Sequence, residues 1–444
     1  RTLLKDTSIY SLSTFLGRGF SLITVPIYTR FLSPSDYGAL DLLSYLAVFL
    51  PLVLGLALDQ AVARFYIETK TEIEKKKIAS TVLIYNMVAL LFGVCIASAF
   101  APQLAALWLN NQVGQETVIM AFVLVWASAL FQIANNQLKY MFKVKKFAIC
   151  NIGNTVVSTA LSIWFIVVMQ WGIFGVFLAQ AISQFCFALL SLYYGRRAYG
   201  LFFDWQKFKS MVEYSLPLVP STIAFFGMQY TDRYALNELR ELHDVGLYGI
   251  GARLASLVFL FLTGFQGAWH PIVMRTYKDP GVQNKFKMVF SYFVFITSSI
   301  LIVVSLFGQE VLHILATDAF GNGYIVVPLL VSAAILSSIG TYFSYGIQIE
   351  KKSKIRLHIN IGGFILNIIL NILFIKFLGI VGAALATFTS FLLIAWMSMA
   401  VSQRAYYVPY EWLRVISALI VALIVSNVVV FWPMEISVNV MLFK

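Results

Sequence analysis

The chain has 444 residues, of which 60% are hydrophobic, 16% aromatic and only 12% charged. An ordinary soluble domain has about 25% charged residues, so this composition indicates an integral membrane protein. One membrane helix with its connection uses roughly 33 residues, which leaves room for about 13 crossings and for no sizeable soluble domain. The three cysteines lie in apolar runs without CxxC spacing, which argues against disulfide frameworks, zinc sites and thiol redox motifs.

The apolar segments are near 20 residues long, and barrel strands would be alternating runs of about ten, so we predict membrane helices. In chain order the segments are Thr7–Phe31, Gly38–Phe65, Ile78–Leu107, Val118–Tyr140, Ala148–Met169, Ile173–Tyr194, Tyr214–Leu236, Val245–Val273, Val289–Phe307, Ile325–Ile349, Leu357–Phe377, Val381–Val401 and Leu413–Trp432. A fourteenth segment begins at Ile436, and we expect the natural chain to continue beyond both printed ends. The predicted fold class is an all-α polytopic membrane protein.

An internal duplication organises these segments. The stretch Gln170–Gln184 matches Phe377–Phe391 at a spacing of 207, and NIG at Asn151–Gly153 recurs at Asn360–Gly362. Each repeat holds six crossings, so both halves enter the membrane with the same orientation. We therefore predict an N-terminal six-helix bundle (1–198), an amphipathic cytoplasmic connection (199–213), a C-terminal six-helix bundle (214–405) and additional C-terminal helices 13 and partial 14 (406–444).

The net charge of +12 comes from basic residues that lie almost entirely between the apolar segments. With a cytoplasmic N-terminus, 24 of the 32 Lys and Arg residues fall on the cytoplasmic side. This asymmetry fixes the orientation by the positive-inside rule and directs the charge toward anionic lipid headgroups. A role in nucleic-acid binding therefore loses its main support.

Four arginines lie within segments, where a charge is costly and normally faces a cavity or a partner: Arg18, Arg64, Arg233 and Arg253. Arg18 is roughly 16 Å into the first segment, close to the middle of the membrane. We predict that these cations bind an anion. The alternative for Arg18 and Arg253 is ion pairing with Asp232 or Asp41 to hold helices together.

Residues beside the deepest arginine predict a hinge. Gly17 and Gly19 flank Arg18, and Pro26 removes a backbone hydrogen bond further along the same segment. We predict that this helix bends during transport. The alternative for the two glycines is close helix packing.

Two interpretations are open for the other polar residues, which either line a cavity or bond other parts of the protein. Asp59 lies one turn from Arg64 and is predicted either to face a cavity or to pair with that arginine. Polar residues including Asp232, Gln229, Tyr230, Gln266 and Asn135–Gln137 are candidates for a cavity that meets sugar hydroxyls. Stripes of asparagine and serine in the fifth and eleventh segments are typical of interhelical hydrogen bonding.

No enzymatic constellation is present. The four histidines lack an HExxH neighbour, a GxSxG partner or a second histidine at ligand spacing, and there is no ATP-binding motif. We therefore expect no catalytic residues, no metal and no cofactor, and leave open a coupling ion, Na⁺ or H⁺.

Four stretches carry a resemblance to a known family over nearly the whole chain: TRFLSPSDYGALDLL (Thr29–Leu43), GLALDQAVARFYIE (Gly55–Glu68), EYSLPLVPSTIAFFGMQYTDRYAL (Glu213–Leu236) and VGLYGIGARLASL (Val245–Leu257). They resemble the polysaccharide transporters, or Wzx-type lipid-linked oligosaccharide flippases of the O-antigen, capsule or teichoic-acid type. These belong to the multidrug/oligosaccharidyl-lipid/polysaccharide (MOP) exporter superfamily.

The resemblance implies two bundles around a cationic cavity, alternating access, and undecaprenyl-diphosphate oligosaccharide as the cargo for surface polysaccharide such as lipopolysaccharide. It matches Arg18, Arg64 and Arg253 to cavity arginines of relatives that flip the peptidoglycan precursor. It further implies a monomer in the bacterial inner membrane, with membrane lipids and polysaccharide polymerase and chain-length proteins as partners.

Two other functions compete with this one. A multidrug or organic-cation antiporter of the same superfamily would need acidic cavity residues. A membrane glycosyl polymerase, ligase or transferase would need a long external loop with acids or His–Arg pairs, and the predicted external loops are short.

The charge asymmetry generates a topology prediction. Single cysteines at Lys76, Lys145, Lys207, Lys285 and Lys352 should react with a membrane-impermeant thiol reagent only from the cytoplasmic side. Labelling of any two of these positions from outside would contradict the arrangement of two bundles with six crossings each.

Overall fold

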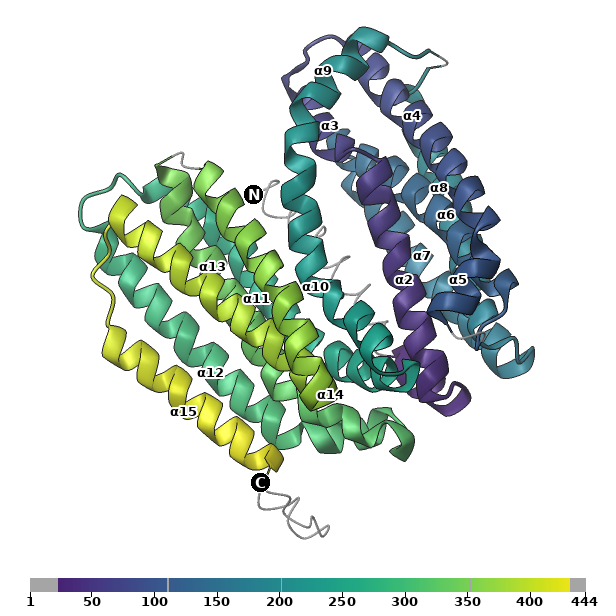
Figure 1. Cartoon of the computed structure of the whole chain (residues 1–444). Helices are drawn as coiled ribbons and strands as arrows, with labels where there is room; N and C mark the ends of the chain where they lie inside the picture. Colours follow the sequence, from purple (N-terminus) through teal and green to yellow (C-terminus); the bar gives the residue numbers. More distant parts are fainter. Residues whose placement is uncertain (1–22, 110–111, 201, 351–352, 432–444) are drawn as a thin grey trace. The chain divides into compact units, whose positions relative to one another are not determined.

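A computed structural model describes residues 23–109, 112–200, 202–350 and 353–431 (Figure 1). Within these residues every regular element is a helix, and nine helices are long and apolar enough to cross a membrane. The predicted all-α polytopic fold is therefore confirmed. Of the hinge residues, Gly17 and Gly19 lie outside the described part of the chain, as do Arg18 and the fourteenth segment.

The chain divides into two compact units, Arg1–Phe226 and Gly227–Lys444. The first unit contains α2 (Pro34–Leu54), α3 (Leu58–Glu68), α4 (Glu72–Ala99), α5 (Ala101–Trp108), α6 (Gln115–Tyr140), α7 (Val144–Ile163), α8 (Gly172–Gly195) and α9 (Trp205–Ser215). The second contains α11 (Leu242–Thr276), α12 (Val282–Leu315), α13 (Val327–Ile349), α14 (Ser353–Ala405) and α15 (Trp412–Phe431). The boundary falls inside α10 (Val219–Leu239).

The connection that was predicted to separate the two bundles is part of the first unit. Its helix α9 packs against α3 and α4, where the Lys207 ammonium lies 2.6 Å from Glu74. Asp204 caps α9 by accepting the N–H of Lys207, and that hydrogen bond together with the Lys77 ammonium lowers the pKa of Asp204 below its usual value. These polar contacts hold the amphipathic stretch against the first unit.

The duplication in the sequence is visible in the backbone. Gly172 and its repeat partner Gly379 both have positive φ, 53° and 55°, at the connection between paired helices. Beside these turns Gly175 packs against Phe165, and Gly382 packs against Phe374. Each helix pair therefore turns at a glycine with positive φ, and α14 is two crossings joined at Gly379.

Polar side chains join the helices of each pair. Ser183 on α8 donates to the Asn154 side chain on α7, and the Asn367 side chain donates to Ser390 across the two halves of α14. Ser183 and Ser390 are repeat partners. These contacts are interhelical hydrogen bonds of the kind that the asparagine and serine stripes predicted.

The second predicted segment is broken rather than continuous. α2 ends at Leu54 and α3 begins at Leu58, and between them Leu56 and Ala57 both have a φ of 51°, the left-handed region. The break leaves the carbonyl of Leu54 without a helical partner, and the Tyr85 hydroxyl from α4 donates to it at 3.1 Å. Pro51, one turn earlier, also weakens the helix.

The close approach at the second-half turn gives a stability prediction. A Cβ at Gly382 would lie 2.2 Å from the carbonyl oxygen of Phe374, whereas a Cβ at the helical Gly362 would meet no atom within 4 Å. Gly382→Ala should lower stability by about 1–3 kcal/mol, and Gly362→Ala should leave it unchanged or raise it. Thermal unfolding of the detergent-purified protein measures both; equal melting temperatures would contradict the close approach of Gly382 to Phe374.

The helix break gives a second prediction. Ala57→Gly should keep or raise the melting temperature, because glycine removes a left-handed cost of about 1–2 kcal/mol. The control Ala106→Gly, at an exposed position within α5, should cost about 1 kcal/mol. A loss of stability in Ala57→Gly as large as that in the control would contradict a left-handed cost at Ala57.

Candidate functional site

The first unit contains a cavity with a volume of about 690 Å³. Its lining comes from α2, α3, α4, α6, α7, α8 and the start of α10. The polar lining residues are Ser44, Asp59, Gln60, Asn86, Ser128, Gln132, Asn151, Asn154, Gln180, Gln184 and Thr222. A cavity with this many hydrogen-bonding groups is suited to a polar ligand or to water.

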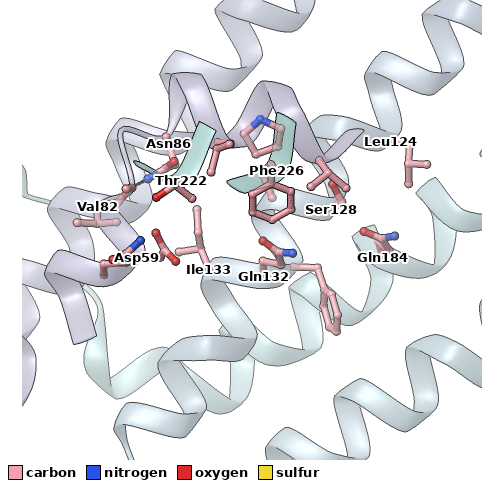
Figure 2. A pocket seen from close by; sticks show the side chains of 18 of the residues that line it. Asp59, Val82, Asn86, Leu124, Ser128, Gln132, Ile133, Gln184, Thr222 and Phe226 are labelled. Atoms are coloured by element: carbon pink, nitrogen blue, oxygen red, sulfur yellow. Dashed lines mark hydrogen bonds between the residues drawn. The ribbon is translucent and has the colours of Figure 1, made fainter. Parts of the chain in front are cut away.

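Figure 2 shows how the labelled side chains are distributed. Asp59 and Asn86 lie toward one end of the cavity, Gln184 lies toward the other, and Gln132 and Phe226 lie between them. Helical spacing explains part of this arrangement, because residues four apart share a helix face. Ser128 and Gln132 are such a pair on α6, and Gln180 and Gln184 are another on α8.

Asp59 is the one ionisable residue among the described residues that line the cavity. The helix break places it in the first turn of α3, where its side chain is exposed to the cavity. The pairing with Arg64 that the sequence allowed does not form, since Arg64 bonds Glu68 instead. The described lining therefore provides a negative charge and neutral polar groups, but no cation.

Arg64 lies outside this cavity lining. Its Nε atom is 2.9 Å from a Glu68 carboxylate oxygen, and its guanidinium lies 4.7 Å from the ring centre of Tyr214. Half of the side chain is exposed. An anion that approaches Arg64 would have to compete with Glu68.

Arg233 and Asp232 form a buried ion pair in the second unit. Their closest side-chain atoms are 3.0 Å apart, and Arg233 also donates to the backbone carbonyl of Gln229. The Tyr248 hydroxyl donates to the other carboxylate oxygen of Asp232, and Arg233 lies over the Tyr248 ring. Both charges thus have partners within the protein, as a buried charge in a membrane requires.

The remaining predicted residues are distributed over both units. Arg253 is half-buried on α11, and the Gln266 side chain donates to Ser338 on α13 at 2.8 Å. Pro26 lies within helical residues 23–31, where the Thr29 hydroxyl donates to the Val25 carbonyl, a contact that favours a bend. The structure does not describe Arg18.

The glutamines of the cavity were missed by reasoning from the sequence, which followed charged residues. The signal was present in the repeat itself. Gln180 and Gln184 in the first half correspond to Thr387 and Phe391 in the second. At the position of Gln184 the first half is therefore polar and the second half is apolar.

Comparison with known proteins gives the family. Residues 3–277 match the family described as polysaccharide biosynthesis protein. The chain is 23% identical over 408 residues to an uncharacterized membrane protein of Methanocaldococcus jannaschii, covering 87% of this chain and 94% of that protein. It is 27% identical over 225 residues to the probable low-salt glycan biosynthesis flippase Agl15 of Haloferax volcanii, covering 48% of this chain and 47% of that protein.

Two solved structures show the fold. The lipid II flippase MurJ in an inward closed conformation superposes with a TM-score of 0.80 at 15% identity, covering 98% of this chain and 95% of MurJ. An inward-facing multidrug resistance MATE transporter gives a TM-score of 0.72 at 15% identity, covering 90% of this chain and 94% of that protein. The chain therefore belongs to the polysaccharide biosynthesis protein family, as its sequence resemblance predicted, and has the fold of the MOP exporter superfamily.

Proposed function

We propose that this protein is a flippase that carries undecaprenyl-diphosphate-linked oligosaccharide from the cytoplasmic to the outer leaflet of the bacterial inner membrane by alternating access. The observation that carries the proposal is a polar cavity inside a membrane-spanning unit of a polysaccharide biosynthesis family member. Sugar hydroxyls and a diphosphate lose their hydration in hydrocarbon, so their passage needs a hydrogen-bonding route. The lipid tail has no such need and can stay in the bilayer.

The diphosphate needs cations, and the described cavity lining has none. The proposed ligands are Arg18 and Arg253, with Arg64 and Arg233 as further candidates. Of these, Arg64 bonds the Glu68 carboxylate and Arg233 bonds the Asp232 carboxylate.

The proposal also assigns the driving force for transport and the helix that bends. The sequence has no ATP-binding motif, so the driving force is assigned to an ion gradient, the membrane potential or the consumption of cargo. Bending of the first helix at Gly17, Gly19 and Pro26 would open the route on one side at a time. The N-terminus is assigned to the cytoplasm, and the working form to a monomer that delivers cargo to polymerase and chain-length proteins for O-antigen-type polymers.

A second candidate is a multidrug or organic-cation antiporter. It is favoured by one observation: the ionisable residue in the described cavity lining is an acid, Asp59. A carboxylate in a membrane cavity attracts an organic cation and repels a diphosphate. The two functions therefore make opposite use of Asp59 and of the arginines.

Reconstituted full-length protein separates the two candidates. Vesicles receive a fluorescent undecaprenyl-diphosphate disaccharide, and a membrane-impermeant periodate treatment reports how much sugar has reached the outside. The wild-type protein should move this lipid, and Arg253→Ala or Arg18→Ala should slow the movement at least about tenfold, the effect of losing one charge-assisted contact of roughly 1.4 kcal/mol or more.

The control is Arg404→Ala, an exposed arginine at the end of α14 that should leave the rate unchanged. Ethidium uptake is measured in the same vesicles. Uptake of ethidium that Asp59→Asn abolishes, together with no movement of the lipid-linked disaccharide, would establish the antiporter and refute the flippase.

A further inference from the structure

The cavity of the first unit contains four glutamine side chains whose amide groups have no hydrogen-bond partner among the described residues. Gln60, Gln132, Gln180 and Gln184 come from α3, α6 and α8. A carboxamide has two N–H donors and an oxygen with two acceptor positions. Left unpaired in a membrane protein these groups cost free energy, so we expect them to meet water or a polar ligand.

The hydroxyl groups of the cavity add acceptors rather than donors. Ser44 and Ser128 each donate to a carbonyl of their own helix, at 2.6 and 2.9 Å, and Thr222 donates at 2.9 Å to the carbonyl of Leu218, the residue before α10. Their remaining lone pairs can accept hydrogen bonds from a ligand. Together with the glutamines they form a surface that both donates and accepts at many points, which is the pattern that vicinal sugar hydroxyls require.

Two phenylalanines, Phe131 and Phe226, are among the apolar residues of the lining. Aromatic rings offer an apolar face to the C–H side of a pyranose ring. The volume of about 690 Å³ is within the range of about 300–1,000 Å³ that small-molecule sites occupy. The cavity of the first unit thus combines sufficient volume, amide groups, acceptor hydroxyls and an aromatic surface.

Asp59 sets the charge of this cavity. No lysine or arginine is among the described lining residues, so a carboxylate on a bound ligand would meet the Asp59 charge without a compensating cation from them. At an effective dielectric constant near 20, two like charges a few ångströms apart repel strongly. A neutral or amino sugar avoids this repulsion, whereas a uronic or other acidic sugar does not.

We infer that the four glutamines form a subsite for the sugar portion of the cargo, and that Asp59 selects neutral or amino sugars against acidic ones. The inference rests on the proposed flippase function and adds the sugar class to it. The sugar subsite lies in the first unit, and its polar residues do not include the arginines assigned to the diphosphate.

The test is binding of free disaccharides to the full-length protein in lipid nanodiscs, measured by saturation-transfer NMR and titration. The probes are N,N′-diacetylchitobiose, which is neutral, and glucuronyl-N-acetylglucosamine, which is acidic. Gln132→Leu and Gln184→Leu should each weaken binding of the neutral disaccharide by about 3- to 10-fold, which is the effect of losing one hydrogen bond. The control Gln103→Leu, an exposed amide on α5 away from the lining, should bind as the wild type does.

Charge selection is tested with the second probe. The wild-type protein should bind the acidic disaccharide at least about tenfold more weakly than the neutral one, and Asp59→Asn should close most of this gap by improving the acidic probe. Melting temperatures equal to wild type show that each variant is folded. If a glutamine variant is unstable, its Gln→Asn counterpart, which keeps an amide and shortens its reach, is measured in its place.

Wild-type binding of the neutral disaccharide that is unchanged in the glutamine variants would overturn the subsite. A preference against the acidic probe that Asp59→Asn leaves intact would overturn the selection. The vesicle assay separates these results from the proposed function: movement of the lipid-linked disaccharide by the same variants at wild-type rate would keep the flippase and refute the subsite. Absence of that movement in the wild-type protein would refute the flippase itself.

Discussion

The constraint on which the structure depends is that hydrocarbon offers no hydrogen bonds, so every polar group in the membrane needs a partner in the protein or in water. The helix breaks show how the chain meets it. The guanidinium of Arg240 donates to the carbonyls of Ile375 and Lys376 just before the turn at Gly379. In the same way, the Tyr85 hydroxyl donates to the carbonyl of Leu54, where the second predicted segment is broken. At both of these breaks a side chain thus supplies the missing hydrogen bond.

The same constraint makes polar groups without a partner among the described residues the better candidates for contacts with a ligand. The Asp232 and Arg233 charges, which the sequence offered as candidate site residues, satisfy one another and Tyr248. They have the geometry of a structural pair, and a ligand would have to displace existing bonds to reach them. The cavity glutamines offer bonds that no described residue uses. Neutral amides are therefore the more informative groups here, although a search from the sequence ranks charges first.

Prediction from the sequence succeeded where a single physical rule decides the outcome. Apolar runs of about 20 residues located the described crossings, and the spacing of 207 located Gly172 and Gly379, which both have positive φ. The position of the break at Leu56 and Ala57 was not predictable in this way, because neither residue favours positive φ, and the Leu54 carbonyl beside it is bonded by Tyr85 from another helix. The cavity likewise depends on which faces of α3, α6 and α8 converge, and that is a property of packing.

The duplication explains why a site can exist in one half of the protein only. Gene duplication supplies the same helix pairs twice, and the residues that hold a pair together are kept in both halves, as Ser183 and Ser390 are. Residues that face away from the pair are free to differ. Gln184 lines the cavity in the first half, and its repeat partner in the second half is Phe391. Because Phe391 is buried, an aromatic ring occupies in the second half the position that is polar and open to a cavity in the first. The scaffold is therefore shared by the two units, whereas the chemistry proposed for the sugar belongs to the first.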